Sequence, residues 1–309
     1  MKKKYAAFVH SLTPFDDKLR VDEAALRRHL RRLKDGGVSV YIGAAGAAEG
    51  YTLSREERNR ILAIAVEELK GKTEVRAAGV EPRDTAEMVE FLRAAEAAKV
   101  DAAQIYSLDM GHGVVPNRKE LESYYYAAIE STSLPVILSN QKKVGYLLPL
   151  DLIEQLAKRY PNFAGYAYDV GDSFYMIDLI RNLGDRLEIN CSGTENAMFS
   201  LGLGANGFQG MEGNIVPKVA ASIVAGFVAK DMDLMHDSFA KLMQVRTILR
   251  GAVRANMRGI KAVLNAFGFD GGQVRPPRML IEGAELDDAV QRIVALRIPE
   301  MADWKLKRA

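Results

Sequence analysis

The sequence predicts one large α/β domain, a (β/α)8 barrel with a C-terminal helical appendage. Strand-like apolar runs alternate with helical patterns eight times over about 230 residues, which is the usual length of an eightfold barrel. From about Asp231 the pattern changes to helices only. A doubly wound open sheet is the alternative, but no Gly-rich dinucleotide fingerprint follows the first apolar run.

The predicted elements follow from short apolar runs for strands and from helical spacing of apolar residues. The strands cover about Tyr5–Leu12, Val38–Ala44, Glu74–Gly79, Ala102–Tyr106, Val136–Ser139, Phe163–Tyr168, Leu187–Cys191 and Gly207–Gly210. The helices between them cover about Asp22–Lys34, Ser54–Leu69, Asp84–Ala97, Lys119–Ser131, Leu150–Arg159, Phe174–Leu183, Thr194–Leu201 and Val216–Ala229.

Three further helices are predicted in the tail, at Met232–Ala255, Gly259–Phe267 and Glu285–Leu296. A Gly- and Pro-containing break at Gly268–Pro277 precedes the last of them. We therefore predict a barrel in residues 1–230 and a C-terminal helical region in residues 231–309.

The composition fits a folded protein with a large core and no polyanion partner. Of the 309 residues, 48% are hydrophobic and 27% are charged, so the chain can bury a core and disorder is excluded. The 42 Lys and Arg residues nearly balance the 40 Asp and Glu residues, and the net charge of +2 gives no field for nucleic acid or a membrane. The basic run Arg27–Lys34 is interleaved with leucines at helical spacing and fits a solvated helix face.

The number of cysteines indicates the cellular compartment in which the protein works. Cys191 excludes an internal disulfide and suits a reducing cytoplasm, and its place in an apolar run favours a buried thiol over a nucleophile. The longest apolar stretch, Ala220–Ala229, is too short to span a bilayer. We expect a soluble, cytoplasmic protein.

Groups of residues spread over nearly the whole chain match one known family. They are Ser11–Phe15, Tyr51–Arg58, Leu134–Leu138, Gly204–Gly207 with Gly213–Pro217, and Lys261 with Val274–Pro277. Together they resemble the dihydrodipicolinate synthase and N-acetylneuraminate lyase superfamily. The resemblance implies a barrel, a homotetramer built as a dimer of dimers, and a sixth-strand lysine whose amine forms a Schiff base with a 2-oxo acid.

The sequence departs from that family pattern at the reacting positions. Ungapped placement puts Ala167 at the Schiff-base lysine and Ser139 at the fifth-strand tyrosine, whereas the neighbouring Asn140 matches. The second-strand motif of two threonines before Gly-Glu keeps only Glu49. The simultaneous loss of these groups favours a natural branch with other chemistry.

Four residues are predicted to carry that chemistry. Alternation along a strand places Asp169 on the same face as position 167, where it acts as an acid, a base or a metal ligand, or else caps the next helix. His10 lies where the family has a small residue on the first strand, and an imidazole near a barrel mouth suits proton transfer, with core packing as the alternative. The predicted catalytic residues are His10, Asp169, Tyr168 and Ser139.

A second set is predicted to bind substrate at the strand ends where barrel active sites lie. Lys142 and Lys143 lie close to the family's carboxylate-binding arginine. They hold a carboxylate, supply a displaced Schiff-base amine, or are simply solvated. His112, in a Gly-containing loop, serves the substrate or a subunit interface. The set is Gly46, Ala47, Glu49, Asn140, Lys143, Ala167, Asn190, Gln209, Glu212 and His112.

No cofactor and no metal site are predicted. Asp169, Glu212, Glu81, His10 and His112 together could hold a divalent cation, but no local ligand spacing supports one. We predict a lyase or hydratase acting on a small carboxylate or 2-oxo acid without the lysine Schiff base. The alternative is a non-catalytic small-acid binding or sensor protein, and the new polar residue His10 favours the enzyme.

Overall fold

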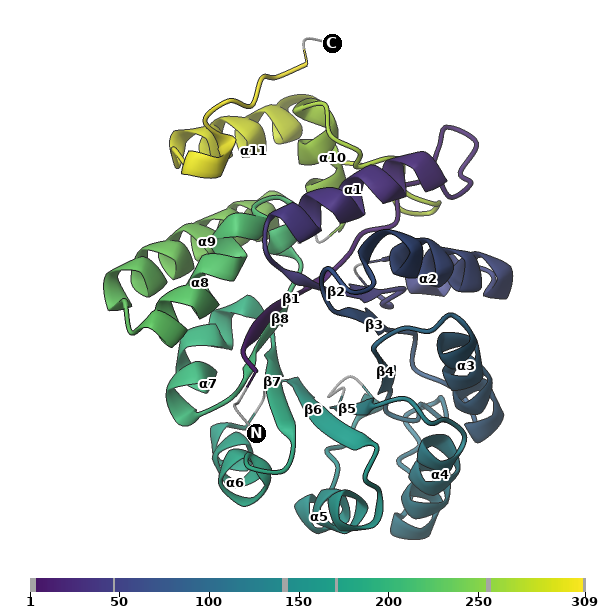
Figure 1. The fold of residues 1–309 in the computed structure, drawn as a ribbon. Coiled ribbons are helices and arrows are strands. Elements are labelled where there is room, and N and C mark those ends of the chain that lie inside the picture. The colour runs from purple at the N-terminus through teal and green to yellow at the C-terminus, as the bar shows by residue number, and fades with distance from the viewer. Residues whose placement is uncertain (1–3, 47, 141–143, 170–171, 254–256, 308–309) are drawn as a thin grey trace. The chain divides into compact units, whose positions relative to one another are not determined.

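Eight strands, β1 to β8, close into a barrel in chain order, and helices alternate with them along the chain (Figure 1). This computed structural model describes residues 4–46, 48–140, 144–169, 172–253 and 257–307. The strand pairs whose register is known are parallel. The predicted (β/α)8 fold class is therefore confirmed.

The observed elements lie close to the predicted ranges. The strands are β1 Ala6–His10, β2 Ser39–Ile42, β3 Val75–Ala77, β4 Ala102–Ile105, β5 Val136–Asn140, β6 Phe163–Asp169, β7 Glu188–Ser192 and β8 Gly207–Gly210. The helices are α1 Glu23–Asp35, α2 Arg55–Leu69, α3 Thr85–Ala97, α4 Arg118–Glu130, α5 Leu150–Arg159, α6 Ser173–Leu183, α7 Ala197–Leu203, α8 Pro217–Ala229, α9 Met232–Val253, α10 Met257–Ala266 and α11 Gly283–Ala295. Short 3-10 turns are η1 Gly50–Thr52, η3 Thr194–Asn196, η4 Glu212–Asn214 and η5 Pro299–Met301. Over the described residues, no helix combines the length and the apolar character needed to cross a membrane.

Helix starts follow local capping chemistry. The Asp22 side chain accepts a hydrogen bond from the first turn of α1. Ser54 with Glu57, and Asn117 with Glu120, form capping boxes at α2 and α4. These side chains satisfy N–H groups that have no acceptor within the helix. The starts of these helices could therefore be located in the sequence to within a residue.

The first strand is shorter than the predicted Tyr5–Leu12 because its last residues leave the ladder. The Ser11 N–H still donates to the Tyr41 carbonyl at 2.9 Å. The Leu12 N–H instead donates to the Asn214 side chain at 3.1 Å. The hydrogen bond that the strand ladder would provide at Leu12 is thus provided by the Asn214 side chain, which is distant in the sequence.

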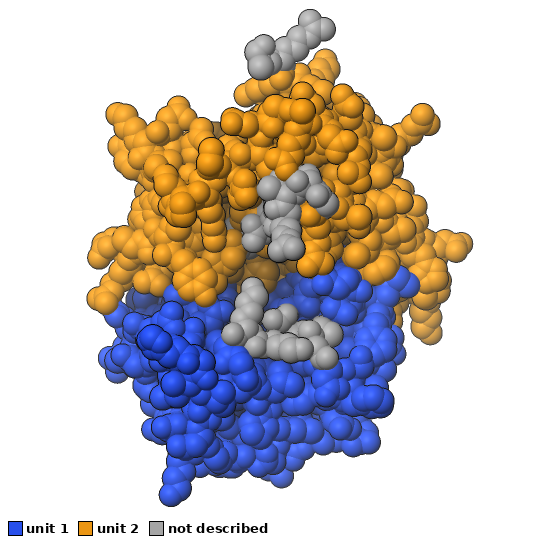
Figure 2. All heavy atoms as spheres, turned by 180° about the vertical axis from the view of Figure 1, so that it is seen from behind, with its two compact units in different colours: residues 1–5, 76–209 blue, residues 6–75, 210–309 orange. Residues whose placement is uncertain are grey.

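The chain divides into two compact units, which Figure 2 colours separately. Unit 1 consists of residues 1–5 and 76–209, and unit 2 consists of residues 6–75 and 210–309. Within unit 2, α9 packs against α8 and α11. The C-terminal helices therefore belong to the same compact unit as β1 and β2, whereas the predicted boundary lies at residue 230.

Contacts with α6 identify the face of β6 that points toward the helices. The Tyr166 hydroxyl lies 3.2 Å from the Tyr175 hydroxyl, and the Tyr168 ring stacks on Tyr175 with centroids 5.3 Å apart. Because side chains alternate along a strand, Gly165 and Ala167 lie on the opposite face, toward the barrel interior. The strand registers place further unit 1 residues on that interior face: Arg76, Gln104, Ser139, Glu188, Asn190 and Gln209.

A buried ion pair in unit 2 ties the loop after β2 to the C-terminal helices. The side chains of Glu49 and Lys261 are fully buried. Lys261 Nζ donates to Glu49 Oε1 at 2.5 Å and to the Gln273 carbonyl at 2.7 Å, and it lies 4.5 Å from the centroid of the Phe15 ring. Burial lowers the pKa of Lys261 to about 8, and the Glu49 carboxylate opposes that shift. The ammonium form therefore dominates at neutral pH.

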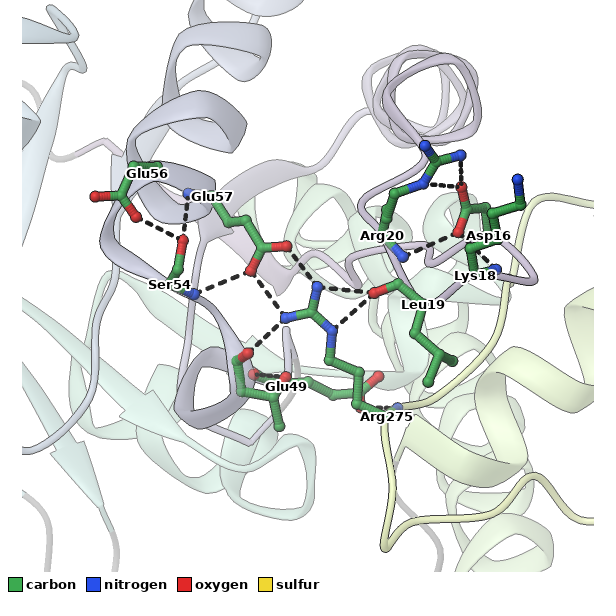
Figure 3. A network of polar contacts seen from close by, with 10 residues as sticks. Asp16, Lys18, Leu19, Arg20, Glu49, Ser54, Glu56, Glu57 and Arg275 are labelled. Carbon is green, nitrogen blue, oxygen red and sulfur yellow. Dashed lines mark hydrogen bonds and ion pairs between the residues drawn. The ribbon is translucent and has the colours of Figure 1, made fainter.

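Arg275 extends the network to the loop after β1, as Figure 3 shows. Its guanidinium binds both carboxylate oxygens of Glu57, at 2.5 and 2.8 Å, and donates to the Leu19 carbonyl at 2.8 and 3.0 Å. The Arg275 N–H also donates to Glu49 at 3.3 Å. Glu57 in turn accepts from the Ser54 N–H. The loops after β1 and β2 are thus both bound to the segment that follows α10.

Replacing Lys261 by methionine is expected to destabilise the protein by about 3–5 kcal/mol, because it leaves the Glu49 carboxylate buried without its main partner. The double variant Lys261→Met/Glu49→Gln should lose less than the sum of the two single changes. Urea unfolding followed by circular dichroism measures all three.

Lys241→Met is the matched control, because its pair with Asp237 lies on the surface of α9, where Asp237 is 59% exposed. Exposed pairs contribute about 0–1 kcal/mol, so this change should be small. Strict additivity of the Lys261 and Glu49 changes would show that the buried pair is not coupled.

Candidate functional site

The interior face of unit 1 carries uncharged polar side chains that are almost inaccessible. Gln104, Ser139, Asn190 and Gln209 are each 2% exposed or less. Gln104 Nε2 donates to Gln209 Oε1 at 3.4 Å, and Asn190 Nδ2 donates to Glu188 Oε1. Amide and hydroxyl groups therefore line a region that apolar side chains would fill in an ordinary barrel core.

Two acceptors in this set lack donors. Among the residues that the structure describes, Asn190 Oδ1 and Gln104 Oε1 are buried without a hydrogen-bond partner. A buried polar atom left unpaired costs about 1–3 kcal/mol, so such atoms are uncommon in folded proteins. The arrangement fits a ligand that brings hydroxyl or amine hydrogens to this face.

An ion pair on the same face was not predicted from the sequence. Arg76 on β3 is 2% exposed, and its two terminal nitrogens each lie 2.8 Å from an oxygen of Glu188 on β7. Because Asn190 donates to the same carboxylate, Arg76 orients the Asn190 amide through Glu188. The available signal was an arginine between Val75 and Ala77 in an otherwise apolar run.

Ala167 presents only a methyl group to the interior. It is fully buried and packs in one cluster with Ala102 and Ile137. Its position in the register is between Ser139 and Asn190. No amine is therefore present in β6, whose sequence is FAGYAYD.

Tyr168 lies on the helix side of β6, which corrects its predicted role in proton transfer. Its ring is fully buried, and its hydroxyl donates to the Asp172 carbonyl at 2.7 Å and accepts from the Asp172 N–H at 2.8 Å. Tyr168 therefore shapes the entry to α6. Asn140 pairs with Tyr168 in the register and shares its face. Its substrate contact stays a prediction.

His10 is the last residue of β1 in unit 2, and its ring is held by an aromatic neighbour. The imidazole stacks on Tyr41 with ring centroids 5.2 Å apart, and the Phe8 ring is tilted against the same Tyr41 ring with centroids 5.3 Å apart. Phe8, His10 and Tyr41 share one face, while Val9 lies on the opposite face against Gly213. His10 is partly exposed.

Glu49 and Glu212 each pair with a cation of the C-terminal helices, which is not the substrate contact predicted for them. The Glu49 carboxylate is fully buried and bound by Lys261. Glu212 is 4% exposed and pairs with Arg246 of α9 at 2.6 Å. Both carboxylates are engaged by cations from the C-terminal helices, a pairing that local sequence does not reveal.

The remaining predicted residues lie in loops or outside the described part. Gly46 is exposed after β2, and His112 is exposed with a φ of 51° in the loop after β4. Ala47 and Lys143 lie outside the described residues, and for Asp169 only the backbone, at the end of β6, is described. Across the described residues no group of three or more His, Cys, Asp and Glu side chains is placed to hold a metal ion.

Comparison with known proteins connects this chain to one family of enzymes. The model of the dihydrodipicolinate synthetase family matches residues 4–296. A probable 5-dehydro-4-deoxyglucarate dehydratase of Methylobacterium radiotolerans is 31% identical over 279 residues, 89% of each chain. A 4-hydroxy-tetrahydrodipicolinate synthase of Sorangium cellulosum is 27% identical over 295 residues, 94% of this chain and 96% of that protein.

Solved structures show the same fold at lower identity. A dihydrodipicolinate synthase of Bacillus anthracis superposes with a TM-score of 0.85 at 20% identity, over 96% of this chain and 99% of that one. The Clostridium difficile protein CdNal, solved with mannosamine, gives 0.84 at 21% identity, over 94% and 99%. The prediction of an enzyme of the lyase class in this superfamily is confirmed. The chain belongs to the dihydrodipicolinate synthetase family.

Proposed function

We propose that the protein is a lyase that removes water from a small hydroxylated 2-oxo or dehydro sugar acid, without a Schiff base to β6. The observation that carries this proposal is the polar interior of unit 1, where Asn190 Oδ1 and Gln104 Oε1 lack donors among the described residues. A polyhydroxy acid brings hydroxyl donors, whereas pyruvate brings only acceptors. The relatives named as probable 5-dehydro-4-deoxyglucarate dehydratases support the same substrate class.

Dehydration of such an acid breaks a C–H bond beside the carbonyl carbon and the C–O bond of the neighbouring hydroxyl. A base takes the proton, the electron pair forms the C=C bond, and the hydroxyl leaves as water once it receives a proton. One histidine can accept the first proton and deliver it to the leaving group. We assign this role to His10, at the end of β1, with Asp169 at the end of β6 as a second proton-transfer group.

The electron pair needs a temporary acceptor during this reaction. The family resemblance assigns that role to a lysine iminium, and this chain has Ala167 at the matching position. Hydrogen-bond donors at the carbonyl oxygen can stabilise the developing negative charge instead. We assign them to the Ser139 hydroxyl and the Gln209 amide, which are both buried on the interior face.

Treatment with pyruvate and sodium borohydride is expected to leave residues 163–169 unlabelled, because no amine is present in β6. Mass mapping of proteolytic peptides measures the adduct, and a 4-hydroxy-tetrahydrodipicolinate synthase with the family lysine serves as the positive control. A stable adduct on Lys142 or Lys143 would show that the Schiff base has moved, and the proposed mechanism would then be wrong.

His10→Asn should reduce turnover of 5-dehydro-4-deoxyglucarate by about 10²- to 10⁴-fold, because asparagine cannot transfer protons. Release of product is followed by mass spectrometry, and circular dichroism checks that the variant is folded. His236→Asn is the matched control, since this histidine is exposed on α9. Normal turnover by the His10 variant would identify the histidine as a packing residue.

We also propose a homotetramer in the cytoplasm. Apolar side chains are exposed after β4, with Met110 39%, Val114 50% and Val115 53% accessible, and such a patch fits a subunit contact. The single cysteine, Cys191, fits a reducing compartment. Light scattering at micromolar concentration should give the mass of four chains, and the mass of one chain would refute the assembly.

A further inference from the structure

We propose that Asn214 and His29 are positioning residues that hold the backbone of His10 in place for proton transfer. This inference rests on the proposed function, because it assigns His10 the transfer step. Asn214 belongs to η4 and His29 to α1, and both lie in unit 2 with His10. Neither residue was singled out in the sequence for a chemical role.

The Asn214 amide uses all four of its hydrogen-bonding positions. Its Nδ2 donates to the His10 carbonyl at 2.9 Å and to the Met211 carbonyl at 2.8 Å. Its Oδ1 accepts from the Leu12 N–H at 3.1 Å and lies 2.9 Å from His29 Nε2. If the amide were flipped, its NH2 group would face the Leu12 N–H and its oxygen would face the His10 and Met211 carbonyls. Only one orientation of the amide is therefore compatible with these neighbours.

The bonds to Asn214 determine the state of His29. Asn214 Oδ1 can only accept, so His29 Nε2 must carry the hydrogen, and the ring is the neutral Nε2–H tautomer. His29 is 2% exposed, and burial lowers its pKa to about 3, with the Arg32 and Lys261 charges acting in the same direction and the Asn214 bond opposing them. His29 therefore stays a neutral donor at physiological pH.

The backbone of η4 is itself anchored to α1. The Arg32 guanidinium donates to the carbonyls of Asn214 and Ile215, the latter at 3.0 Å. Arg32 lies one helical turn beyond His29 on α1, so both side chains reach the same segment. Helix α1 thus holds Asn214 at its side chain and at its main chain.

This arrangement matters because the β1 ladder ends at this point. Beyond the Ser11 N–H bond to Tyr41, the neighbouring His10 carbonyl and Leu12 N–H are both bound by one side-chain amide. An error of about 1 Å in the position of a reacting group can reduce rate about 10²-fold. Asn214 therefore fixes the backbone from which the His10 side chain extends, and stacking on Tyr41 fixes the orientation of the imidazole ring.

The test compares variants that keep or remove single hydrogen bonds. Asn214→Asp keeps the oxygen that accepts from Leu12 and His29. It replaces the NH2 group by a second oxygen, which then faces the carbonyls of His10 and Met211. It should reduce kcat for 5-dehydro-4-deoxyglucarate about 10²-fold with KM changed less than about twofold. His29→Leu removes one donor and should reduce kcat less, and His29→Gln, which restores an amide donor, should recover it. Leu30→Ala is the control, because it removes buried volume from α1 and Leu30 takes no part in the hydrogen bonds of Asn214 described above.

A second readout needs no substrate. The chain has four histidines, so the imidazole signal of His10 can be assigned in NMR spectra from His→Gln variants. His29→Leu, which adds no charge, should move the His10 imidazole signal at fixed pH, and Leu30→Ala should leave it unchanged. If this signal and kcat stay the same in the His29 and Asn214 variants, Asn214 is only structural and the proposal is overturned.

The two proposals can fail separately. Normal turnover by His10→Asn would refute the proton-transfer role, while a change of the His10 NMR signal in the His29→Leu variant would still support positioning. A pH series adds a check on His29. Because its folded pKa lies below the ordinary value of 6.5, its contribution to stability is complete above pH 6.5 and is lost as pH falls toward 3. His29→Gln should therefore flatten this decline, and an unchanged decline would contradict the neutral buried histidine.

Discussion

The buried pair of Glu49 and Lys261 is the interaction on which the arrangement of unit 2 depends. A buried ion pair contributes little net stability, because desolvation of both charges offsets their attraction. The pair instead disfavours alternative packings, because any packing that separated Glu49 from Lys261 would leave an unpaired charge in the interior. Here the ammonium is satisfied by a carboxylate, a carbonyl and an aromatic face, and the carboxylate also receives the Arg275 N–H. These contacts therefore fix the position of the segment after α10 beside the loops after β1 and β2.

Unit 1 is organised by a different kind of polarity. One ion pair, Arg76 with Glu188, satisfies both of its charges and orients the Asn190 amide. The remaining interior groups are uncharged, and two of their oxygens lack donors among the described residues. A full set of internal hydrogen bonds would stabilise an empty barrel better, and the lack of donors is the observation behind the hydroxylated substrate that we propose. The same face carries the methyl group of Ala167.

Prediction from the sequence succeeded where local rules control the outcome. The ranges of strands and helices were close to those observed, because capping residues and apolar spacing act over a few positions. Alternation along β6 was the right rule for position 167, and the observed register shows that Asn190 shares its face. It also should have excluded Tyr168 from the predicted catalytic set, since position 168 must lie opposite position 167. Glu49 was assigned to substrate from the family motif and Glu212 from its place at a strand end, and their cationic partners could not be foreseen because they lie far away in the sequence.

The sequence by itself determined the fold class, the alternation of strand faces and the absence of an amine in β6. These properties depend on residue type and on spacing within about ten positions. Only the tertiary structure decided which polar groups satisfy one another. Glu49 meets Lys261 across 212 positions, and Asn214 meets the His10 carbonyl across 204. The physical reason is that a hydrogen bond requires a partner within about 3 Å, and chain folding brings such partners together without any trace in local sequence.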